Sequence, residues 1–335
     1  MRANAAERLL QHYVDNFRTL PWRSPPGAAP PDPYRVWLSE VMLQQTTVAA
    51  VAPRFERFIR RWPTVQDLAA AADEEVLSEW AGLGYYARAR NLIACAREVA
   101  ARGGFPDTEP ELRKLPGIGE YTAAAIAAIA FGKRAVVIDS NVERVAARLT
   151  ALERPSKAEL RIAVDAITPK TNAGDFAQAM MDLGATVCRP RQPLCGECPL
   201  RSKCNGFARG TPGHFPVPKP RTVRPIRYGT AYWVERNSAV WLVRRPPSGL
   251  LGGMSALPGP KWGSEAAMAE GAELASVRHV FTHFELRLTI IAGSRPIGKG
   301  WWQPISSIAD AGLPTLYRRA VDAILDGERE QRHAT

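Results

Sequence analysis

The pattern of apolar and polar residues differs between the two halves of the chain. In the first half, apolar runs end at residues that stop helices, since YYARARNLIACAREVAARGG ends at two glycines and YTAAAIAAIAFG ends at Gly132. A further helix is expected after Pro63-Thr64, because Asp67 lies three residues beyond Thr64 and matches a helix-start pattern. These signals predict an all-α first half.

The second half carries the β-branched and aromatic residues that are typical of strands. They alternate or cluster in TAYWVERNSAVWLVRR and FELRLTIIAG, and a final helix is expected near residues 316–325, so we predict a smaller α+β domain. Between the halves, residues 207–227 contain five prolines and five basic residues without an acidic one, which predicts a semi-extended linker. A second proline-rich stretch, residues 24–33, is expected to be a surface loop.

The composition favours a globular protein with a polyanionic partner. The chain has 335 residues, enough for two or three domains, and its 44 Lys+Arg exceed its 33 Asp+Glu, giving a net charge of +11. Nucleic acid is the leading partner, although solvated surface lysines and arginines alone can produce this charge. The chain has neither an export signal nor an apolar stretch of about 18 residues, so we expect a cytoplasmic protein without a membrane span.

Four of the five cysteines are spaced closely enough to surround one metal centre. They occur in CRPRQPLCGECPLRSKC, separated by six, two and five residues: Cys188, Cys195, Cys198 and Cys204. Four thiolates at this spacing can hold tetrahedral zinc or a four-iron cluster, and disulfides are the weaker alternative in a cytosolic protein. The basic residues beside them suit phosphates or serve only as solubilising charge: Arg189, Arg191, Arg201 and Lys203. Cys95, in an alanine-rich helix, is expected to be a small buried side chain.

Two glycines precede a predicted helix in LPGIGEYTAAAI. Gly117 and Gly119 permit a tight turn whose N–H groups, with the helix N-terminus behind them, can bind a phosphate; an ordinary turn is the alternative. Further along, VIDSNVERVAARL places Asp139 and Asn141 just before another helical pattern. Taken alone, Asp139 is expected to cap that helix.

A carboxylate stands inside an apolar run in WLSEVMLQQTTV. Glu40 has Val41 and Met42 beside it and is followed by two adjacent glutamines, Gln44 and Gln45. From this segment alone, a glutamate on the solvent face of an amphipathic helix is the simpler interpretation. Burial among apolar side chains would instead raise the pKa of Glu40 toward that of a usable general acid.

Together these motifs resemble those of the MutY-type adenine DNA glycosylases, within the helix-hairpin-helix superfamily, over nearly the whole chain. SEVMLQQT, GLGYYARARNL, LPGIGEYTAAA, the aspartate before NVERV, the four-cysteine loop and FTHFEL occur in family order. The resemblance implies a mainly α helix-hairpin-helix module at residues 1–206, with a six-helix subdomain at about 30–132 and an iron-sulfur subdomain at 1–29 and 133–206. It also implies a smaller α+β Nudix-like domain at 228–330, after the linker at 207–227.

The resemblance assigns the chemistry to two carboxylates. Glu40 would be the acid that protonates adenine opposite 8-oxoguanine or guanine, and Asp139 would stabilise the sugar cation as the base departs. Tyr121 and Asn141 would lie with them at the catalytic site. The four cysteines would hold one four-iron, four-sulfur cluster.

Tyr121 also bears on the type of glycosylase. In endonuclease III-like enzymes the corresponding residue of GIGEYTA is a lysine, which attacks the sugar and leads to strand cleavage. A tyrosine has no amine and forms no imine, so we expect a monofunctional enzyme. A bifunctional glycosylase and a non-catalytic iron-sulfur DNA-binding regulator are the alternatives.

The resemblance further implies a monomer that binds double-stranded DNA. The expected DNA-binding residues are Gln44, Gln45, Tyr85, Arg88, Arg90, Gly117, Gly119, Thr282 and His283. The glutamines would probe base edges, Tyr85 would wedge beside the opposite base, and the two arginines would meet the backbone. Thr282 and His283, in FTHFEL, would contact 8-oxoguanine. The Nudix-like half lacks an REx2EE helix, so no nucleotide hydrolysis is expected.

Four positions depart from the family pattern. Ser140 stands where glycine is usual after the catalytic aspartate, Thr282 stands where serine is usual, and Ser255-Ala256 replaces a common Trp-Glu pair. None of these departures removes a reacting group. Ser140 would tighten the backbone beside Asp139 and slow catalysis.

Overall fold

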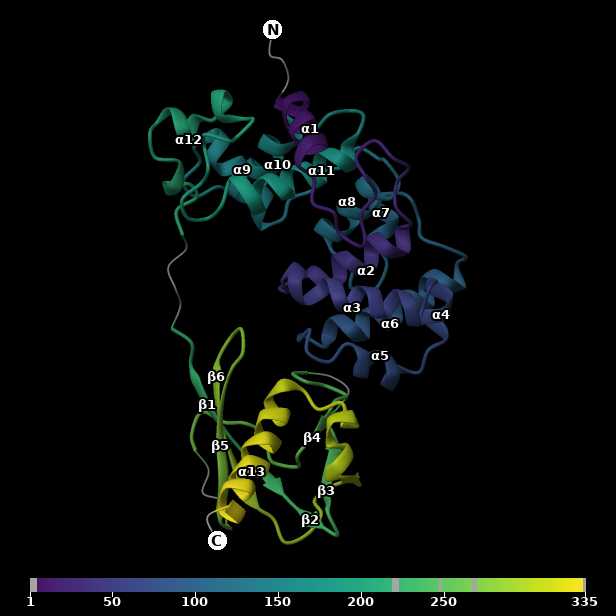
Figure 1. The fold of residues 1–335 in the computed structure, drawn as a ribbon, viewed down its shortest axis with the longest axis vertical. Helices are drawn as coiled ribbons and strands as arrows, with labels where there is room; N and C mark the ends of the chain where they lie inside the picture. Colours follow the sequence, from purple (N-terminus) through teal and green to yellow (C-terminus); the bar gives the residue numbers. More distant parts are fainter. Residues whose placement is uncertain (1–4, 219–222, 247–248, 267–269, 334–335) are drawn as a thin grey trace. The chain divides into compact units, whose positions relative to one another are not determined.

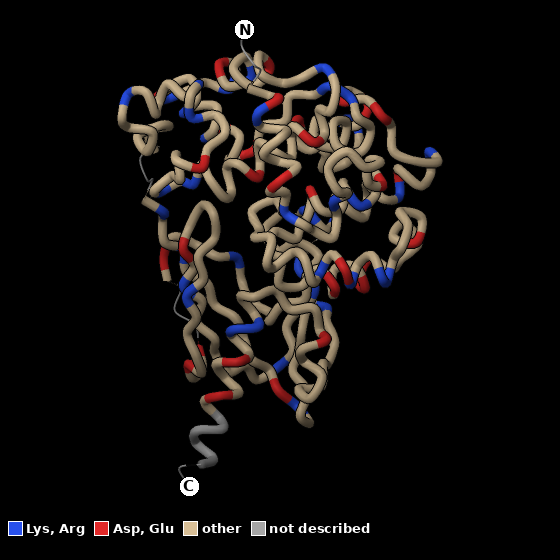
Figure 2. The backbone as a smooth tube through the Cα atoms, turned by 45° about the horizontal axis from the view of Figure 1, so that its top comes forward, with Lys and Arg blue, Asp and Glu red and all other residues tan. Residues whose placement is uncertain are grey.

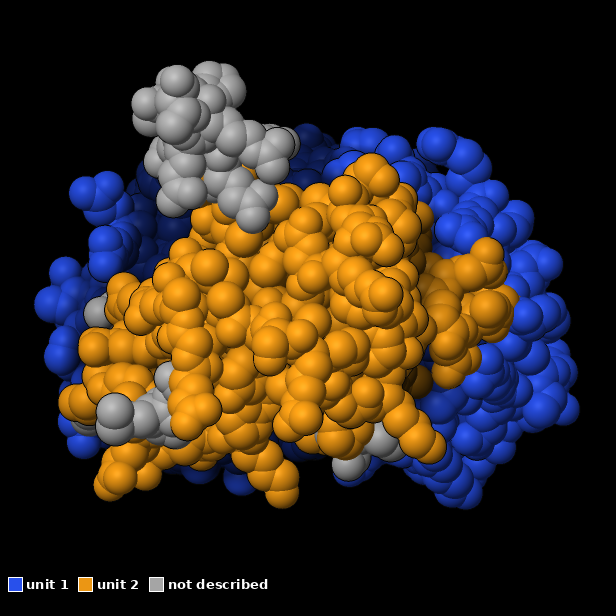
Figure 3. Space-filling view, turned by 90° about the horizontal axis from the view of Figure 1, so that it is seen from below, with its two compact units in different colours: residues 1–70, 91–219 blue, residues 71–90, 220–335 orange. Residues whose placement is uncertain are grey.

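A computed structural model describes residues 5–218, 223–246, 249–266 and 270–333. The chain divides into two units, residues 1–70 with 91–219 and residues 71–90 with 220–335 (Figure 3). Basic and acidic positions are interspersed along both units (Figure 2). In the described residues, no helix has both the length and the apolar character needed to cross a membrane.

The first unit is helical, as the sequence predicted (Figure 1). Its longer helices are α1 (Ala5–Asn16), α2 (Pro33–Leu43), α3 (Val48–Arg61), α8 (Glu120–Ile129), α9 (Ser140–Thr150), α10 (Lys157–Asp165) and α11 (Ala173–Asp182). Helix α6 (Ala87–Ala101) begins in the second unit and continues in the first. The shorter elements are α4 (Val65–Ala70), α7 (Glu109–Leu112), α12 (Asn205–Ala208), η1 (Leu183–Val187), η2 (Arg201–Lys203) and η3 (Pro212–His214).

Local signals set several helix ends where they were predicted. Before α4, the Thr64 N–H donates to Asp67 Oδ2 at 3.0 Å, and the Asp67 N–H donates to Thr64 Oγ1 at 3.2 Å. Gly103, after α6, and Gly132, after α8, have positive φ angles, which glycine adopts without strain. These predictions are confirmed.

Helix α8 forms the centre of the first unit. Its residues from Thr122 to Ile129 are buried, and it packs against α2, α7 and α11. Small residues let α11 pack closely against α8. A side chain at Gly174 of α11 would not fit, because its Cβ would lie 2.6 Å from the Ala128 carbonyl oxygen of α8. The packing brings the first turn of α8, with Tyr121, close to α2, which carries Glu40.

The linker begins later than the predicted residue 207. Phe215 is buried in the first unit, and its carbonyl oxygen accepts a 3.0 Å hydrogen bond from Arg148 Nε. The Val217 N–H donates to the Glu153 carbonyl oxygen at 2.7 Å. A proline-rich composition therefore misplaced this boundary, because a buried aromatic ring and long-range bonds fix the segment on the first unit. Residues 219–222 of the predicted linker lie outside the described residues.

Residues 71–90, which contain α5 (Asp73–Glu79), also differ from the prediction. We expected them in the six-helix subdomain, but they group with the C-terminal half of the chain. Arg90 Nη1 donates to the Gly252 carbonyl oxygen at 2.6 Å, and Tyr85 Oη lies 3.1 Å from Thr282 Oγ1. The sequence pattern did not indicate these contacts, because they join positions far apart in the chain.

The second unit contains two sheets, which agrees with the predicted α+β half. Strand β6 (Glu285–Ala292) pairs in parallel with β1 (Ile226–Trp233) and antiparallel with β5 (Glu273–Val280). In the other sheet, β3 (Ala239–Arg244) pairs antiparallel with β2 (Glu235–Arg236), β4 (Ser255–Ala256) and β7 (Gly300–Pro304). Helix α13 (Thr315–His333) follows η4 (Ile305–Ala311) and packs against β5 (Figure 1). Leu286, Leu288 and Ile290 of β6 fill the core together with Leu316 and Val321 of α13.

Candidate active site

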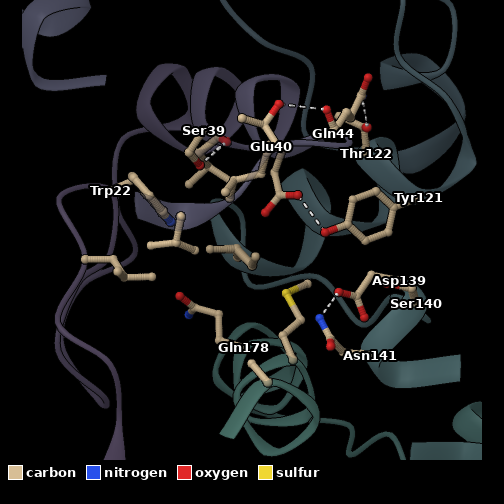
Figure 4. Close-up of a pocket in the computed structure, with 18 of the residues that line it drawn as sticks. Trp22, Ser39, Glu40, Gln44, Tyr121, Thr122, Asp139, Ser140, Asn141 and Gln178 are labelled. Atoms are coloured by element: carbon tan, nitrogen blue, oxygen red, sulfur yellow. Dashed lines mark hydrogen bonds between the residues drawn. The ribbon is translucent and has the colours of Figure 1, made fainter. Parts of the chain in front are cut away.

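A cavity of about 910 Å³ in the first unit is lined by α2, α8, the start of α9 and α11 (Figure 4). It brings together many of the site residues expected from the sequence: Glu40, Gln44, Gln45, Gly117, Gly119, Tyr121, Asp139 and Asn141. The other expected residues belong to the second unit or to the cysteine loop. The cavity is therefore the candidate catalytic site.

Glu40 is a buried carboxyl group on α2. The helix begins at Pro33, where Asp32 accepts a hydrogen bond from the Tyr34 N–H, and most of its residues are buried, so Glu40 has only 6 % of its surface exposed. Burial raises the pKa of Glu40 to about 7, and the charge of Asp139 adds to the rise, while a hydrogen bond from Tyr121 opposes it. Tyr121 Oη donates to Glu40 Oε2 at 2.7 Å. At neutral pH a large fraction of Glu40 is therefore protonated.

Asp139 is the N-cap of α9. Its Oδ1 accepts a 2.7 Å hydrogen bond from the Val142 N–H, and its Oδ2 accepts one of 2.8 Å from Asn141 Nδ2 (Figure 4). The cap role expected from the sequence is thus present, and the same carboxylate lines the cavity. Two fixed donors hold Asp139 in one orientation, which suits a group that must face a developing charge.

Arg144 connects this carboxylate to the cysteine loop, and the sequence reasoning missed it. Its Nη2 donates to Asn141 Oδ1 at 2.9 Å and to the Gly184 carbonyl oxygen at 2.6 Å. Its Nε donates to the Cys188 carbonyl oxygen at 2.9 Å. One side chain thereby fixes the amide that holds Asp139. The only sequence signal was its position, one helical turn after Asn141.

The four cysteines line one small cavity together with apolar residues that include Val187 and Leu194. The buried Arg148 organises this loop, because its guanidinium donates to the carbonyl oxygens of Cys188 and Arg189 and to Cys188 Sγ at 3.3 Å. In the part of the chain that the structure describes, no three His, Cys, Asp or Glu side chains are arranged to hold a single metal ion. As expected, Cys95 is fully buried.

A buried ion pair in the cavity wall was also missed. Arg23 Nη1 lies 2.7 Å from Asp182 Oδ2, and Arg18 Nε donates to Asp182 Oδ1 at 2.6 Å. Trp22 and Gln178 line the same cavity (Figure 4). No sequence signal linked the N-terminal segment to α11, because these residues meet only through tertiary packing.

The glycine turn before α8 has the geometry that the sequence predicted. Gly117 has a φ of 73°, and an added Cβ would lie 2.6 Å from Asn91 Cβ, so both conformation and space require glycine. Gly119 is the N-cap of α8 and supplies no side chain to bond its first turn. Backbone N–H groups at such a helix start can bind a phosphate.

The two arginines expected to contact DNA both donate hydrogen bonds to the protein backbone. Arg88 is buried, donates to the Leu83 carbonyl oxygen at 2.8 Å, and lies over the rings of Trp80 and Tyr85. Arg90 bonds the Gly252 carbonyl oxygen. Neither the burial of Arg88 nor the hydrogen bond of Arg90 could be predicted from the sequence.

Tyr85, Thr282 and His283 are exposed in the second unit. Tyr85 has 48 % of its surface exposed, and Thr282 and His283 lie between β5 and β6. The sequence alone also allowed a strand with exposed side chains, but the structure places the pair in the turn between the two strands.

Comparison with known proteins adds a family to this geometry. Residues 38–170 match the family model of the HhH-GPD superfamily of base excision DNA repair proteins, and residues 230–323 match a NUDIX domain. The adenine DNA glycosylase of Mus musculus is 33% identical, over 90% of this chain and 74% of that protein. The chain belongs to the adenine DNA glycosylases. The glycosylase is also 42% identical to the adenine DNA glycosylase of Mycolicibacterium smegmatis, over 61% of this chain and 71% of that protein.

Solved structures support the helical half of this glycosylase. A thermostable thymine-DNA glycosylase superposes with a TM-score of 0.54 at 28% identity, covering 61% of this chain and 95% of that one. A trapped covalent complex of endonuclease III with DNA superposes with a TM-score of 0.52 at 27% identity, and the match covers 62% of this chain and 95% of that one. The predicted family and fold class are therefore confirmed.

Proposed function

We propose that this glycosylase removes adenine opposite 8-oxoguanine or guanine by hydrolysis of the N-glycosidic bond. The observation that carries the proposal is the buried Glu40 carboxyl group, with its pKa near 7, in one cavity with Asp139. A non-catalytic DNA-binding protein would have no use for this pair. Release of labelled adenine from such a duplex tests the proposal; release of thymine or an oxidised pyrimidine instead would contradict it.

Glu40 supplies the proton that makes adenine a leaving group. Its carboxyl proton passes to a ring nitrogen of adenine as the electron pair of the glycosidic bond moves onto the base. The deoxyribose then carries oxocarbenium character. The bond from Tyr121 Oη fixes one oxygen of Glu40, so the group is oriented before the base arrives.

Asp139 stabilises the sugar cation. Its charge is held by the Val142 N–H and by Asn141, and Arg144 fixes Asn141 in turn. Attack by water at the sugar carbon then yields an abasic site, with one proton lost from water to complete the hydrolysis. A transient covalent ester with Asp139 is an alternative route to the same product, as in glycosidases with paired carboxylates.

The reaction ends at the abasic site because the cavity wall carries Tyr121 where a bifunctional enzyme has lysine. A tyrosine hydroxyl forms no imine. Two lysines near it in sequence are paired with carboxylates, Lys114 with Glu111 and Lys133 with Asp107. Neither of these two lysines lines the cavity that holds Glu40 and Asp139.

Borohydride trapping tests the monofunctional assignment. The glycosylase incubated with its duplex and borohydride should give no stoichiometric protein–DNA adduct, because no Schiff base forms. The matched variant is Tyr121→Lys, which places an amine at this position and should trap DNA. Stoichiometric trapping of the unmodified protein, measured by gel shift under denaturing conditions, would overturn the assignment.

Adenine must leave the duplex to reach the cavity, at a cost of a few kcal/mol. We propose that Gln44 and Gln45 probe base edges, that Tyr85 wedges beside the opposite base, and that Gly117 and Gly119 bind a phosphate. Thr282 and His283 would contact 8-oxoguanine from the β5–β6 turn. We also propose that the protein acts as a monomer in the cytoplasm.

We propose that the four cysteines hold one four-iron, four-sulfur cluster. The four thiols line one cavity, and four cysteine thiolates are the ligand set of a four-iron, four-sulfur cluster. The bond from Arg148 to Cys188 Sγ suits a thiolate. When bound, the cluster would act as a structural crosslink that fixes the basic loop for DNA.

Metal analysis tests the cluster. Anaerobically purified protein should contain four iron and four sulfide per chain, and Cys198→Ser should lower both together with duplex affinity, because the loop loses its crosslink. The matched control is Cys95→Ala, which changes a buried cysteine on α6 and should keep full iron. Zinc in place of iron, or unchanged iron in Cys198→Ser, would contradict the proposal.

A further inference from the structure

Ser140 is a cavity residue at which this chain departs from the glycine usual in the family. It is the first residue of α9, directly after Asp139, and it lines the catalytic cavity (Figure 4). Ser140 is exposed, and its φ angle is not positive, so a serine side chain causes no backbone strain at this position. The serine therefore adds a hydroxyl group beside Asp139 without changing the conformation.

The polar side chains next to Ser140 are already engaged within the protein. Both carboxylate oxygens of Asp139 accept hydrogen bonds, one from the Val142 N–H and one from Asn141 Nδ2. Asn141 Oδ1 accepts from Arg144 Nη2, and the Ser140 carbonyl oxygen accepts from Arg144 Nη1 at 3.4 Å. In the part of the chain that the structure describes, the Ser140 hydroxyl has no hydrogen-bond partner. It is thus free to bind a substrate group.

The proposed reaction brings a phosphate close to this hydroxyl. Asp139 stabilises the sugar cation, so the deoxyribose of the flipped nucleotide must lie against Asp139. That sugar carries a phosphate on its 3′ oxygen and another on its 5′ oxygen, each within a few bonds of the carbon that loses the base. Serine hydroxyls commonly donate to DNA phosphates, and a hydrogen bond to a charged oxygen is stronger than one to a neutral oxygen. Glycine has no side chain to make this contact.

We propose that the Ser140 hydroxyl donates a hydrogen bond to a phosphodiester oxygen that flanks the flipped adenine nucleotide. The bond holds the sugar of that nucleotide against Asp139. It carries no information about the base, because every nucleotide has the same phosphate. This inference rests on the proposed removal of adenine, and it adds a substrate-binding side chain to the same cavity.

Binding is measured with a duplex whose adenine nucleotide carries fluorine at the 2′ carbon, which destabilises the sugar cation and prevents cleavage. Ser140→Ala should weaken binding about tenfold, the value of a hydrogen bond to a charged group. Ser140→Thr keeps a hydroxyl and should keep the affinity. The matched control is Ser78→Ala, an exposed serine on α5, which should bind as the parent does. On a cleavable duplex, the rate at saturating protein should fall much less than the affinity, because the bond is present before and during cleavage.

Neutral phosphates identify the contact. A methylphosphonate on the 5′ or the 3′ side of the adenine nucleotide removes the charge of one phosphate. At the contacted phosphate, the tenfold difference between the parent and Ser140→Ala should shrink to about twofold, because a neutral acceptor forms a weaker bond. A methylphosphonate several nucleotides away should leave the difference unchanged. An equal difference on every duplex, or no difference on the unmodified duplex, would overturn the inference.

A further variant separates this role from an effect of serine on the backbone. If the serine strained the backbone beside Asp139, Ser140→Gly would release adenine faster than the parent, and that result would overturn the inference. We expect Ser140→Gly to bind as weakly as Ser140→Ala, with melting temperatures near that of the parent because the side chain is exposed. If the parent releases no adenine, the proposed function fails. If the parent releases adenine and the binding differences are missing, only the inference about Ser140 fails.

Discussion

Glu40→Gln should lower the rate of adenine release on the order of a thousandfold, the value of a positioned general acid. Glutamine has the same shape and can still accept the bond from Tyr121, but it has no proton to give. Duplex binding should be retained because the side chain is buried. The measurement is single-turnover release, with Glu56→Gln on the exposed face of α3 as the matched control. Near-normal release by Glu40→Gln would remove it from the mechanism.

The pH dependence follows from the same group. The pKa of Glu40 is raised to about 7, mainly by burial, and the acid must be protonated to act. The single-turnover rate should therefore be flat below about pH 7 and fall about tenfold per pH unit above it. A rate that stays flat to high alkaline pH would contradict Glu40 as the acid.

The stability of the folded state should also fall as pH rises. Because the pKa of Glu40 is higher in the folded state than in the unfolded state, its contribution is complete below the unfolded value and is lost as pH rises through about 7. At pH 8 the buried charge should cost on the order of 3 kcal/mol. The Glu40→Gln variant should thus melt at a higher temperature than the parent at pH 8.

Asp139→Asn should lower adenine release by at least about a hundredfold, because the negative charge that stabilises the sugar cation is lost. Asparagine caps helices as well as aspartate does, so the bond from the Val142 N–H and the start of α9 should persist. The matched control is Asp15→Asn, an exposed carboxylate on α1. A melting temperature near that of the parent, with the rate lost, supports a chemical role; full activity would refute it.

Features that depend on neighbours in sequence could be predicted, and features that depend on packing could not. The start of α4, the stops of α6 and α8, and the Gly117 turn follow from local backbone rules. Glu40 and Tyr121 stand 81 positions apart, so only the resemblance to a family joined them before the fold did.

The errors have the same origin. Proline content placed the linker at residue 207, but the burial of Phe215 and its bond from Arg148 keep that segment on the first unit. The burial of Arg88 could not be predicted, because charge is visible in a sequence and burial is not. The link through Arg144 was missed because it joins three segments that meet only in the folded chain.

Adenine removal without strand cleavage can be measured in a single reaction. Anaerobically purified protein is incubated, in excess, with a duplex that carries adenine opposite 8-oxoguanine, and the reaction is divided into alkali-treated and untreated halves. We expect a strand break at the adenine position only after alkali, because Glu40 and Asp139 remove the base and Tyr121 offers no amine to cut the strand. A break without alkali would contradict the monofunctional mechanism, and no break in either half, with the duplex bound, would contradict adenine removal itself.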